Sequence, residues 1–426
     1  MLRELPRMKN HVTAKCIFAI QQLSRLWLAL VVVALSCSAV RAQTVVWSDD
    51  FERADPTDLW TVENGVWELG VPTFGPAPNA LGFRAHSGTN CAATVLGGSY
   101  PEIAATRLIR IPSFIVPSAN QNPRLRFWTW HDFSYDGLDY GVVQVKVNAG
   151  AWLDASPHFA NSGGAWVRSG VDLSAFAGRS VQVAFYIVAG DGFGVSPSVA
   201  AGWYVDDVAL ETGPYVLNNP ESFESGYGDW YAETGLWEWG RPTAGPGVAH
   251  SGSNCVGTVL GGNYSEIGEG RLASPPFVVP AASQNPRLRF WSWHSFAYDS
   301  VDYGVVQVKV GTNAWQNLSS SFVNSGGAWV RSGVDLSAFA GRSVQVAFYF
   351  VAGDGFGVSP SVAAGWYVDD VALEAGPYAL NNPESFESGY GDWYAETGLW
   401  EWGRPTAGPG VSHSGSNCVG TLEAEL

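Results

Sequence analysis

Alternation between apolar and less apolar positions is the dominant pattern of the chain. Val181, Val183, Phe185 and Ile187 alternate with Gln182, Ala184, Tyr186 and Val188, and a similar alternation covers residues 143–147. A period of two predicts strands with one face towards a core. Clusters of Asn, Gly, Pro and Ser separate these runs and predict turns. One helical turn is expected over residues 173–178. So many short strands predict an all-β fold of tandem antiparallel β-sandwich (jelly-roll) modules.

A long internal repeat sets the domain organisation. Residues 161–211 recur at 324–374 with one difference, and residues 216–258 recur at 379–421 with two. A fixed period of this kind indicates tandem copies of one structural unit. We therefore predict a first module over residues 43–214, a second over 215–377, and the truncated start of a third over 378–426. Without its partner strands the last segment buries little surface, so we expect an exposed or loosely docked tail from a truncated or frameshifted gene.

The N-terminal segment has the features of a signal peptide. An apolar run over residues 26–40 follows a basic stretch and precedes Val40-Arg41-Ala42, which fits cleavage after Ala42. The run is short for a membrane span, and we expect no transmembrane segment in the mature chain. Lipidation at Cys37 is the alternative. Residues 1–42 are thus predicted to be a signal peptide, and the protein to be secreted or on the cell surface.

Composition narrows the possible partners and bonds. The chain has 39 Asp and Glu against 23 Lys and Arg. The only lysines after the leader are Lys146 and Lys309. This balance argues against a nucleic-acid partner, which needs clustered cations. Cys91, Cys255 and Cys418 occupy equivalent repeat positions, so each is expected to be a small buried residue rather than half of a disulfide within its module. We expect a monomer.

Several motifs resemble the MAM-like modules of secreted bacterial proteins, including choice-of-anchor J modules and those after the protease domain of immune-inhibitor-A-type metallopeptidases. The resemblance rests on Phe-Glu-Ser-Gly at 223–226, Ala-His-Ser-Gly at 249–252, Leu-Arg-Phe-Trp-x-Trp-His before Asp-Tyr-Gly-Val-Val-Gln-Val, and Gly-Trp-Tyr-Val-Asp-Asp-Val at 202–208 and 365–371. It covers nearly all of the chain after the leader. The resemblance implies a jelly roll used for adhesion or as an accessory to secreted enzymes.

Acidic residues near the ends of each module predict a metal site. In a jelly roll the terminal strands commonly lie side by side, and this would bring the acid after the opening Phe close to the Asp-Asp pair of the last strand. Alternation should send the two adjacent Asp residues to opposite faces. A carboxylate cluster favours Ca²⁺, which takes six to eight oxygen ligands. We therefore predict a structural calcium in each module; turn capping or pairing with Arg is the alternative. The candidate ligands are Glu52, Asp206 and Asp207 in the first module and Glu224, Asp369 and Asp370 in the second.

Aromatic residues supply the candidate ligand platform. Along residues 125–132, Arg126, Trp128 and Trp130 share one face, and Leu125 and Phe127 share the other. One face belongs to the core, and the other is able to stack a sugar ring. The candidate ligand-binding residues are Trp128, Trp130, Trp291 and Trp293. Burial of all four is the alternative.

No catalytic motif accompanies these features. The sequence has neither His-Glu-x-x-His nor Gly-x-Ser-x-Gly, and Asp136 and Asp139 read as turn residues rather than as a glycosidase pair. We therefore predict a non-catalytic binding or adhesion protein for a glycan or an extracellular protein. An accessory region of a metallopeptidase whose catalytic domain is absent, and a structural spacer, are the alternatives.

Overall fold

The protein is all-β in the computed structural model, as predicted. The model describes residues 43–134, 138–160, 164–191, 199–297, 301–323, 327–353, 361–396 and 400–421, and residues 43–426 form one compact unit. Helical elements in this part of the chain are single 3-10 turns. The predicted signal peptide, residues 1–42, lies outside the described residues. Among those described, no helix is long and apolar enough to cross a membrane.

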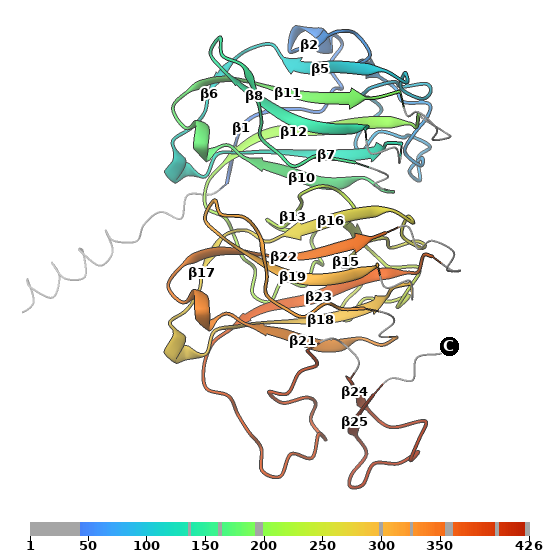
Figure 1. Ribbon diagram of the computed structural model, residues 1–426, viewed down its shortest axis with the longest axis vertical. Helices are drawn as coiled ribbons and strands as arrows, with labels where there is room; N and C mark the ends of the chain where they lie inside the picture. Colours follow the sequence, from blue (N-terminus) through green and yellow to red (C-terminus); the bar gives the residue numbers. More distant parts are fainter. Residues whose placement is uncertain are drawn as a thin grey trace, which may run out of the picture. The chain divides into compact units, whose positions relative to one another are not determined.

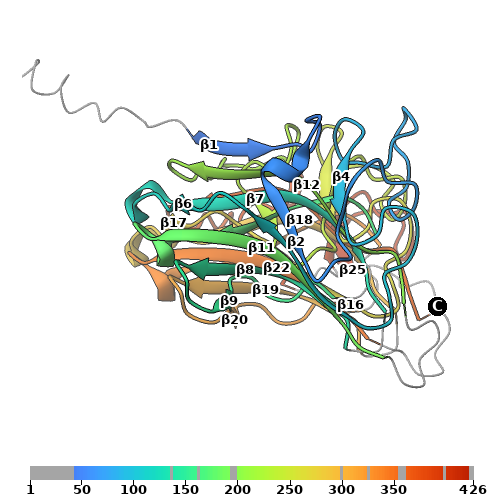
Figure 2. The ribbon, with the colours of Figure 1, turned by 90° about the horizontal axis from the view of Figure 1, so that it is seen from above.

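The first module is a sandwich of two antiparallel sheets (Figure 1). One sheet has the order β10-β7-β12-β4-β3, with β1 beside β12, and the other has the order β2-β5-β11-β8-β9, with β6 beside β11. Viewed from above, β12 and β7 lie in one layer and β11 and β8 in the other (Figure 2). The elements are β1 (Thr44–Asp49), η1 (Pro56–Asp58), β2 (Trp60–Glu63), β3 (Glu68–Gly70), β4 (Cys91–Ala93), β5 (Ala104–Arg110), β6 (Phe114–Ile115), η2 (Ala119–Gln121), β7 (Arg124–Asp132), β8 (Tyr140–Val147), β9 (Trp152–Asp154), β10 (Val167–Asp172), η3 (Ser174–Phe176), β11 (Ser180–Ala189) and β12 (Gly202–Thr212).

The second module repeats this arrangement. Its sheets have the orders β14-β15-β23-β18-β21 and β13-β16-β22-β19-β20, with β17 beside β22, and no sheet among the described residues mixes strands of the two modules. The elements are β13 (Tyr231–Ala232), β14 (Glu238–Gly240), β15 (Cys255–Gly257), β16 (Gly268–Ala273), β17 (Phe277–Val278), η4 (Ala282–Gln284), β18 (Arg287–Ser295), β19 (Tyr303–Val310), β20 (Gln316–Asn317), β21 (Val330–Asp335), η5 (Ser337–Phe339), β22 (Ser343–Ala352) and β23 (Gly365–Glu374).

Inward-facing positions of the two sheets form each core. Val181, Val183, Phe185 and Ile187 are all at most 1% exposed, which confirms the alternation predicted for β11. The Trp203 ring packs against Phe159 and Phe185 at centroid distances of 5.1 and 5.5 Å, and its indole Nε1 donates a hydrogen bond to a core threonine. A large aromatic ring whose polar atom has a partner can be buried at little polar cost. Trp203 is thus a core residue of the first module.

The first and last strands of the first module are neighbours. β1 pairs antiparallel with β12, with Asp49 opposite Val208. In the second module a single bridge between Glu221 and Val371 takes this place. The pairing brings the opening Phe-Glu of each module close to the Asp-Asp pair of its last strand.

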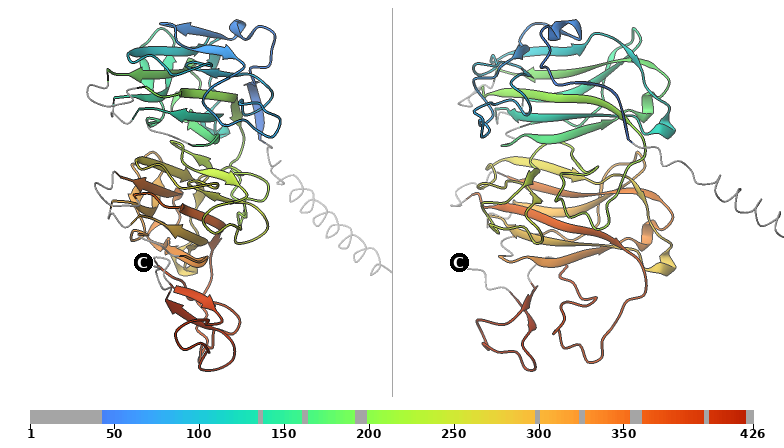
Figure 3. Two further views of the ribbon diagram at one scale, coloured as in Figure 1. Left: turned by 90° about the vertical axis from the view of Figure 1, so that its right-hand side faces the viewer. Right: turned by 180° about the vertical axis from the view of Figure 1, so that it is seen from behind.

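The segment after residue 378 forms one small hairpin among its described residues. Its strands, β24 (Trp400–Gly403) and β25 (Cys418–Thr421), form an isolated hairpin, drawn in dark red in Figure 3. Trp393 and Trp400 are 51% and 50% exposed, whereas their repeat counterparts Trp230 and Trp237 are fully buried. In the second module a Phe of β22 covers both counterparts. One side of the segment, around Trp393 and Trp400, is therefore open.

Candidate functional site at the module junction

Trp130 and Trp293, two of the predicted platform residues, are buried by their own modules. They are 7% and 8% exposed. The Trp130 ring meets Tyr204 edge-on at 5.3 Å, and its Nε1 donates a hydrogen bond to the Gly164 carbonyl at 3.0 Å. Trp293 makes the same edge contact with its own tyrosine at 5.3 Å. These contacts lock both rings against protein groups.

Trp128 and Trp291, the other two platform residues, lie between modules. The His86 ring stacks on Trp128 at 3.7 Å, and Tyr227 of the second module meets Trp128 edge-on at 5.9 Å. Trp291 repeats this with its own histidine at 3.7 Å and with Tyr390 of the C-terminal segment at 5.9 Å. Each ring therefore joins one module to the start of the next. Ligand stacking on these four tryptophans stays a prediction.

A bulge in the last strand changes the predicted direction of the Asp-Asp pair. Strict alternation predicts that Asp206 and Asp207 point to opposite faces, but Asp207 has a φ of 47° and the register of β12 shifts between Asp206 and Ala209. Both carboxylates consequently reach the same loop. Asp206 Oδ2 accepts hydrogen bonds from the backbone N–H groups of His86 and Ser87 at 3.0 and 3.2 Å, and Asp207 accepts from the Ser87 hydroxyl and contacts His86 Nδ1. A bulge residue breaks the two-residue period.

Glu52 holds the other end of that loop. Its carboxylate accepts hydrogen bonds from the backbone N–H groups of Thr89 and Asn90 at 2.7 and 2.5 Å. In the second module, Glu224 binds the N–H groups of Ser253 and Asn254 in the same way, at 2.9 and 2.8 Å. In each module the acids predicted to share a cation thus contact one His-Ser-Gly-x-Asn loop, where each carboxylate already accepts hydrogen bonds.

The Asp-Asp pair has an unusual protonation equilibrium. Burial and the neighbouring Asp207 carboxylate raise the pKa of Asp206 to about 8, and burial raises the pKa of Asp369 to about 7. A proton can therefore relieve the repulsion for which a cation was predicted. In the second module His250, Asp369 and Asp370 have ligand atoms within 4.8 Å of one another. The His250 imidazole is a poorer ligand for Ca²⁺ than an oxygen atom is. Calcium binding stays a prediction.

The first junction combines cationic and aromatic side chains. Arg126, only 4% exposed, places its guanidinium 4.5 Å from the Tyr231 ring centroid and donates through Nη2 to the Asp229 carbonyl at 3.4 Å. Arg168 Nη1 donates to the Gly228 carbonyl at 2.7 Å. The outer face of β7 and β10, the strands that carry these arginines, therefore contacts the opening segment of the second module.

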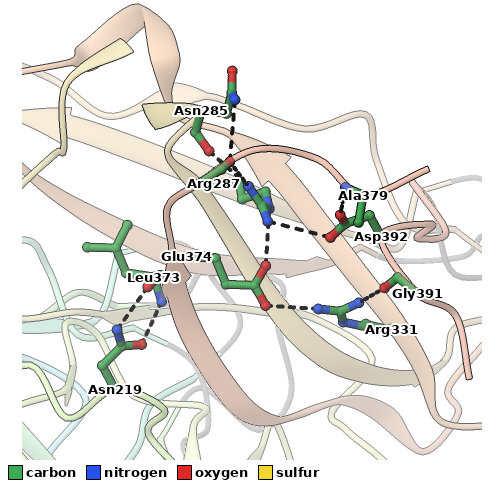
Figure 4. A network of polar contacts seen from close by, with 10 residues as sticks. Asn219, Asn285, Arg287, Arg331, Leu373, Glu374, Ala379, Gly391 and Asp392 are labelled. Atoms are coloured by element: carbon green, nitrogen blue, oxygen red, sulfur yellow. Dashed lines mark hydrogen bonds and ion pairs between the residues drawn. The ribbon is translucent and has the colours of Figure 1, made fainter. Parts of the chain in front are cut away.

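The same contacts recur between the second module and the C-terminal segment (Figure 4). Arg287 forms ion pairs with Glu374 at 3.1 Å and Asp392 at 3.5 Å. Arg331 pairs with Glu374 at 2.8 Å and donates a hydrogen bond to the Gly391 carbonyl. The segment after residue 378 thus docks through specific contacts on one side, although its other side is open.

A cavity of about 440 Å³ lies at the first junction. It is lined by residues of both modules, among them Arg126, Tyr215, Tyr231, Glu233, Lys309 and Trp315. Aromatic rings beside charged and amide groups are typical of pockets that bind small polar ligands. No sequence pattern predicts a site at these residues, and the one signal is Lys309, which is one of two lysines after the leader.

Comparisons with known proteins give a partial match. No family model matches the chain, so the resemblance to MAM-like modules stays a prediction. The chain is similar to Bacillopeptidase F of Bacillus subtilis (strain 168), with 34% identity over 183 residues, which are 42% of this chain and 11% of that protein. The chain therefore spans about a ninth of the length of this relative.

Solved structures with a similar arrangement of strands include binding modules and adhesin domains. The N-terminal CBM22-1-CBM22-2 tandem domain from Paenibacillus barcinonensis Xyn10C has a TM-score of 0.26 and 16% identity, over 80% of this chain and all of that one. The K1 cleaved adhesin domain of Lys-gingipain from Porphyromonas gingivalis W83 has a TM-score of 0.24 and 19% identity, over 40% and 97%. These scores are too low to carry an argument about function.

Proposed function

We propose that the protein is an extracellular, non-catalytic binding or adhesion protein that takes a carbohydrate ligand at the junction between its two modules. The observation that carries the proposal is the junction cavity, which has three aromatic side chains, Tyr215, Tyr231 and Trp315. Sugar rings have apolar faces that pack on aromatic rings and hydroxyl groups that need hydrogen-bond partners. Glu233 and Gln345 line the same cavity and offer such partners.

Trp315 allows a test with a matched control. It lines the cavity, whereas its repeat counterpart Trp152 belongs to the first module and does not. Each ring has a lysine above it, at 4.6 and 4.7 Å respectively, so the two local environments are alike. Residues 43–426 would be screened on an array of glycans and cell-surface polymers. We expect Trp315→Ala to lose the binding and Trp152→Ala to keep it; equal binding by both variants would contradict the proposal.

A structural spacer is the second candidate function. The repeated His-Trp-Tyr contact at both junctions favours it, because each junction then serves to hold successive modules together. An accessory role beside a protease is favoured by the partial match to Bacillopeptidase F. The array separates a spacer from a glycan-binding protein, since a spacer binds no glycan with or without Trp315.

A further inference from the structure

Arg126 is a buried cation at the junction cavity without a carboxylate partner. In the part of the chain that the structure describes, no Asp or Glu oxygen lies within 4.0 Å of its guanidinium, and its Nε has no hydrogen-bond partner. The like charges of Arg124 and Arg168 disfavour the charged form of Arg126. A buried charge is costly unless it is paired. The neighbouring Arg124, by contrast, pairs with Glu211 at 3.3 Å.

Lys309 of the second module also lines the cavity and is a second incompletely paired cation. Its ammonium lies 3.9 Å from Glu233, but Arg271 binds the same carboxylate. One acid is therefore shared between two cations. Glu233 and Asp172 also line the cavity and can accept hydrogen bonds from hydroxyl groups.

We propose that the junction cavity binds a carboxylated sugar, a uronic acid residue of an acidic polysaccharide. The inference rests on the proposed carbohydrate-binding function and names the ligand class. The sugar carboxylate pairs with Arg126, with Lys309 as the second cation, and the sugar ring packs beside Tyr231 or Trp315. A planar guanidinium suits a carboxylate, to which it donates two hydrogen bonds. The volume of about 440 Å³ is large enough for one to two sugar rings.

The repeat supplies a matched control for each cation. Arg289 occupies the position of Arg126 in the second module and stacks on Tyr394 at 4.0 Å, but it does not line the cavity. Lys146 occupies the position of Lys309, over Trp152 in the first module, and does not line the cavity either. Arg289→Gln and Lys146→Gln thus change the same residue types outside the cavity.

The test is isothermal titration calorimetry of residues 43–426 with trigalacturonate and with its methyl ester, which removes the charge and keeps the rings. We expect the acid to bind at least tenfold more tightly than the ester. Arg126→Gln should weaken the acid at least tenfold and Lys309→Gln severalfold, while Arg289→Gln and Lys146→Gln leave it unchanged. Thermal melting confirms that each variant is folded; if Arg126→Gln is not, Lys309→Gln decides.

Three results would overturn the inference. These are no binding of trigalacturonate, equal affinity for acid and ester, or equal effects at cavity and control positions. The array tested with Trp315→Ala judges the proposed function separately. A neutral glycan that needs Trp315 but not Arg126 would preserve carbohydrate binding and reject the acidic ligand.

Discussion

Removing the Trp291 ring should release the C-terminal segment from the second module. The Trp291→Ala variant loses the edge contact with Tyr390, a residue that is 6% exposed in the docked segment. An aromatic pair contributes roughly 1 kcal/mol, and the apolar area of Tyr390 that the ring covers adds about another 1 kcal/mol. The free energy needed to release the segment from the second module should therefore fall by about 2 kcal/mol. This change raises the population with an open, released segment roughly 30-fold.

Limited proteolysis measures this population, because cleavage follows the open fraction when opening and closing are fast. The bonds after Trp393 and Tyr394 are the ones to follow with chymotrypsin and mass spectrometry. The next residue, Ala395, donates its N–H to the Arg331 carbonyl at 2.9 Å, and this contact keeps the docked backbone from extending into a protease. The wild-type segment should resist a low concentration of chymotrypsin, and the segment of the Trp291→Ala variant should be cut roughly 30-fold faster.

Trp128→Ala is the matched control, because Trp128 makes the same contacts at the first junction. It should leave cleavage after Trp393 at the wild-type rate. Equal cleavage of wild type and Trp291→Ala would refute the docking role of the ring. Immediate cleavage of the wild-type segment would instead support the loosely docked tail predicted from the sequence.

Three further outcomes follow from the buried acids and thiols. Burial raises the pKa of Asp206 to about 8 and that of Asp369 to about 7, from 3.8, so folding takes up protons between pH 4 and 8. The free energy of unfolding should therefore fall as pH rises through this range. A melting midpoint that is no lower at pH 8 than at pH 5 would count against the raised pKa values. Millimolar Ca²⁺ should raise the midpoint over chelator at pH 8.5, where these carboxylates are ionised, but not at pH 5; an unchanged midpoint at pH 8.5 would remove calcium from the account. Burial raises the pKa of Cys91 and Cys255, so half-buried Cys418 should react first with a thiol reagent under native conditions, and mass spectrometry showing earlier labelling of Cys91 would exclude this order.

Period-two patterning was sufficient for the strands and the core, but not for the site. It separated Leu125 and Phe127 from Trp128 and Trp130, and the structure places the former two in the core, where both are at most 1% exposed. It did not reveal that the opposite face is covered, because the covering residue Tyr227 lies in a Gly-Tyr-Gly-Asp stretch without periodicity. It also missed the bulge at Asp207, since a single left-handed residue leaves no repeat signal. The cavity joins residues as distant as Arg126 and Lys309, and no local pattern encodes such a contact.

The contacts at the junctions give the stack of modules a direction. Each complete module presents Arg-x-Arg-x-Trp on β7 or β18, and the segment that follows it presents Tyr-Gly-Asp-Trp-Tyr, as at residues 227–231. The first module has the former but not the latter. Its Trp60, which pairs with Phe51 as Trp230 does with Phe223, is flanked by Leu59 and Thr61 instead of Asp229 and Tyr231. Leu59 has no carboxylate to pair with an arginine, as Asp229 pairs with Arg124 at 3.9 Å. Thr61 has no ring for an arginine to cover, as Arg126 covers Tyr231. The opening surface of the first module therefore lacks the carboxylate and the aromatic ring that Asp229 and Tyr231 bring to the junction, and this difference gives the stack its direction.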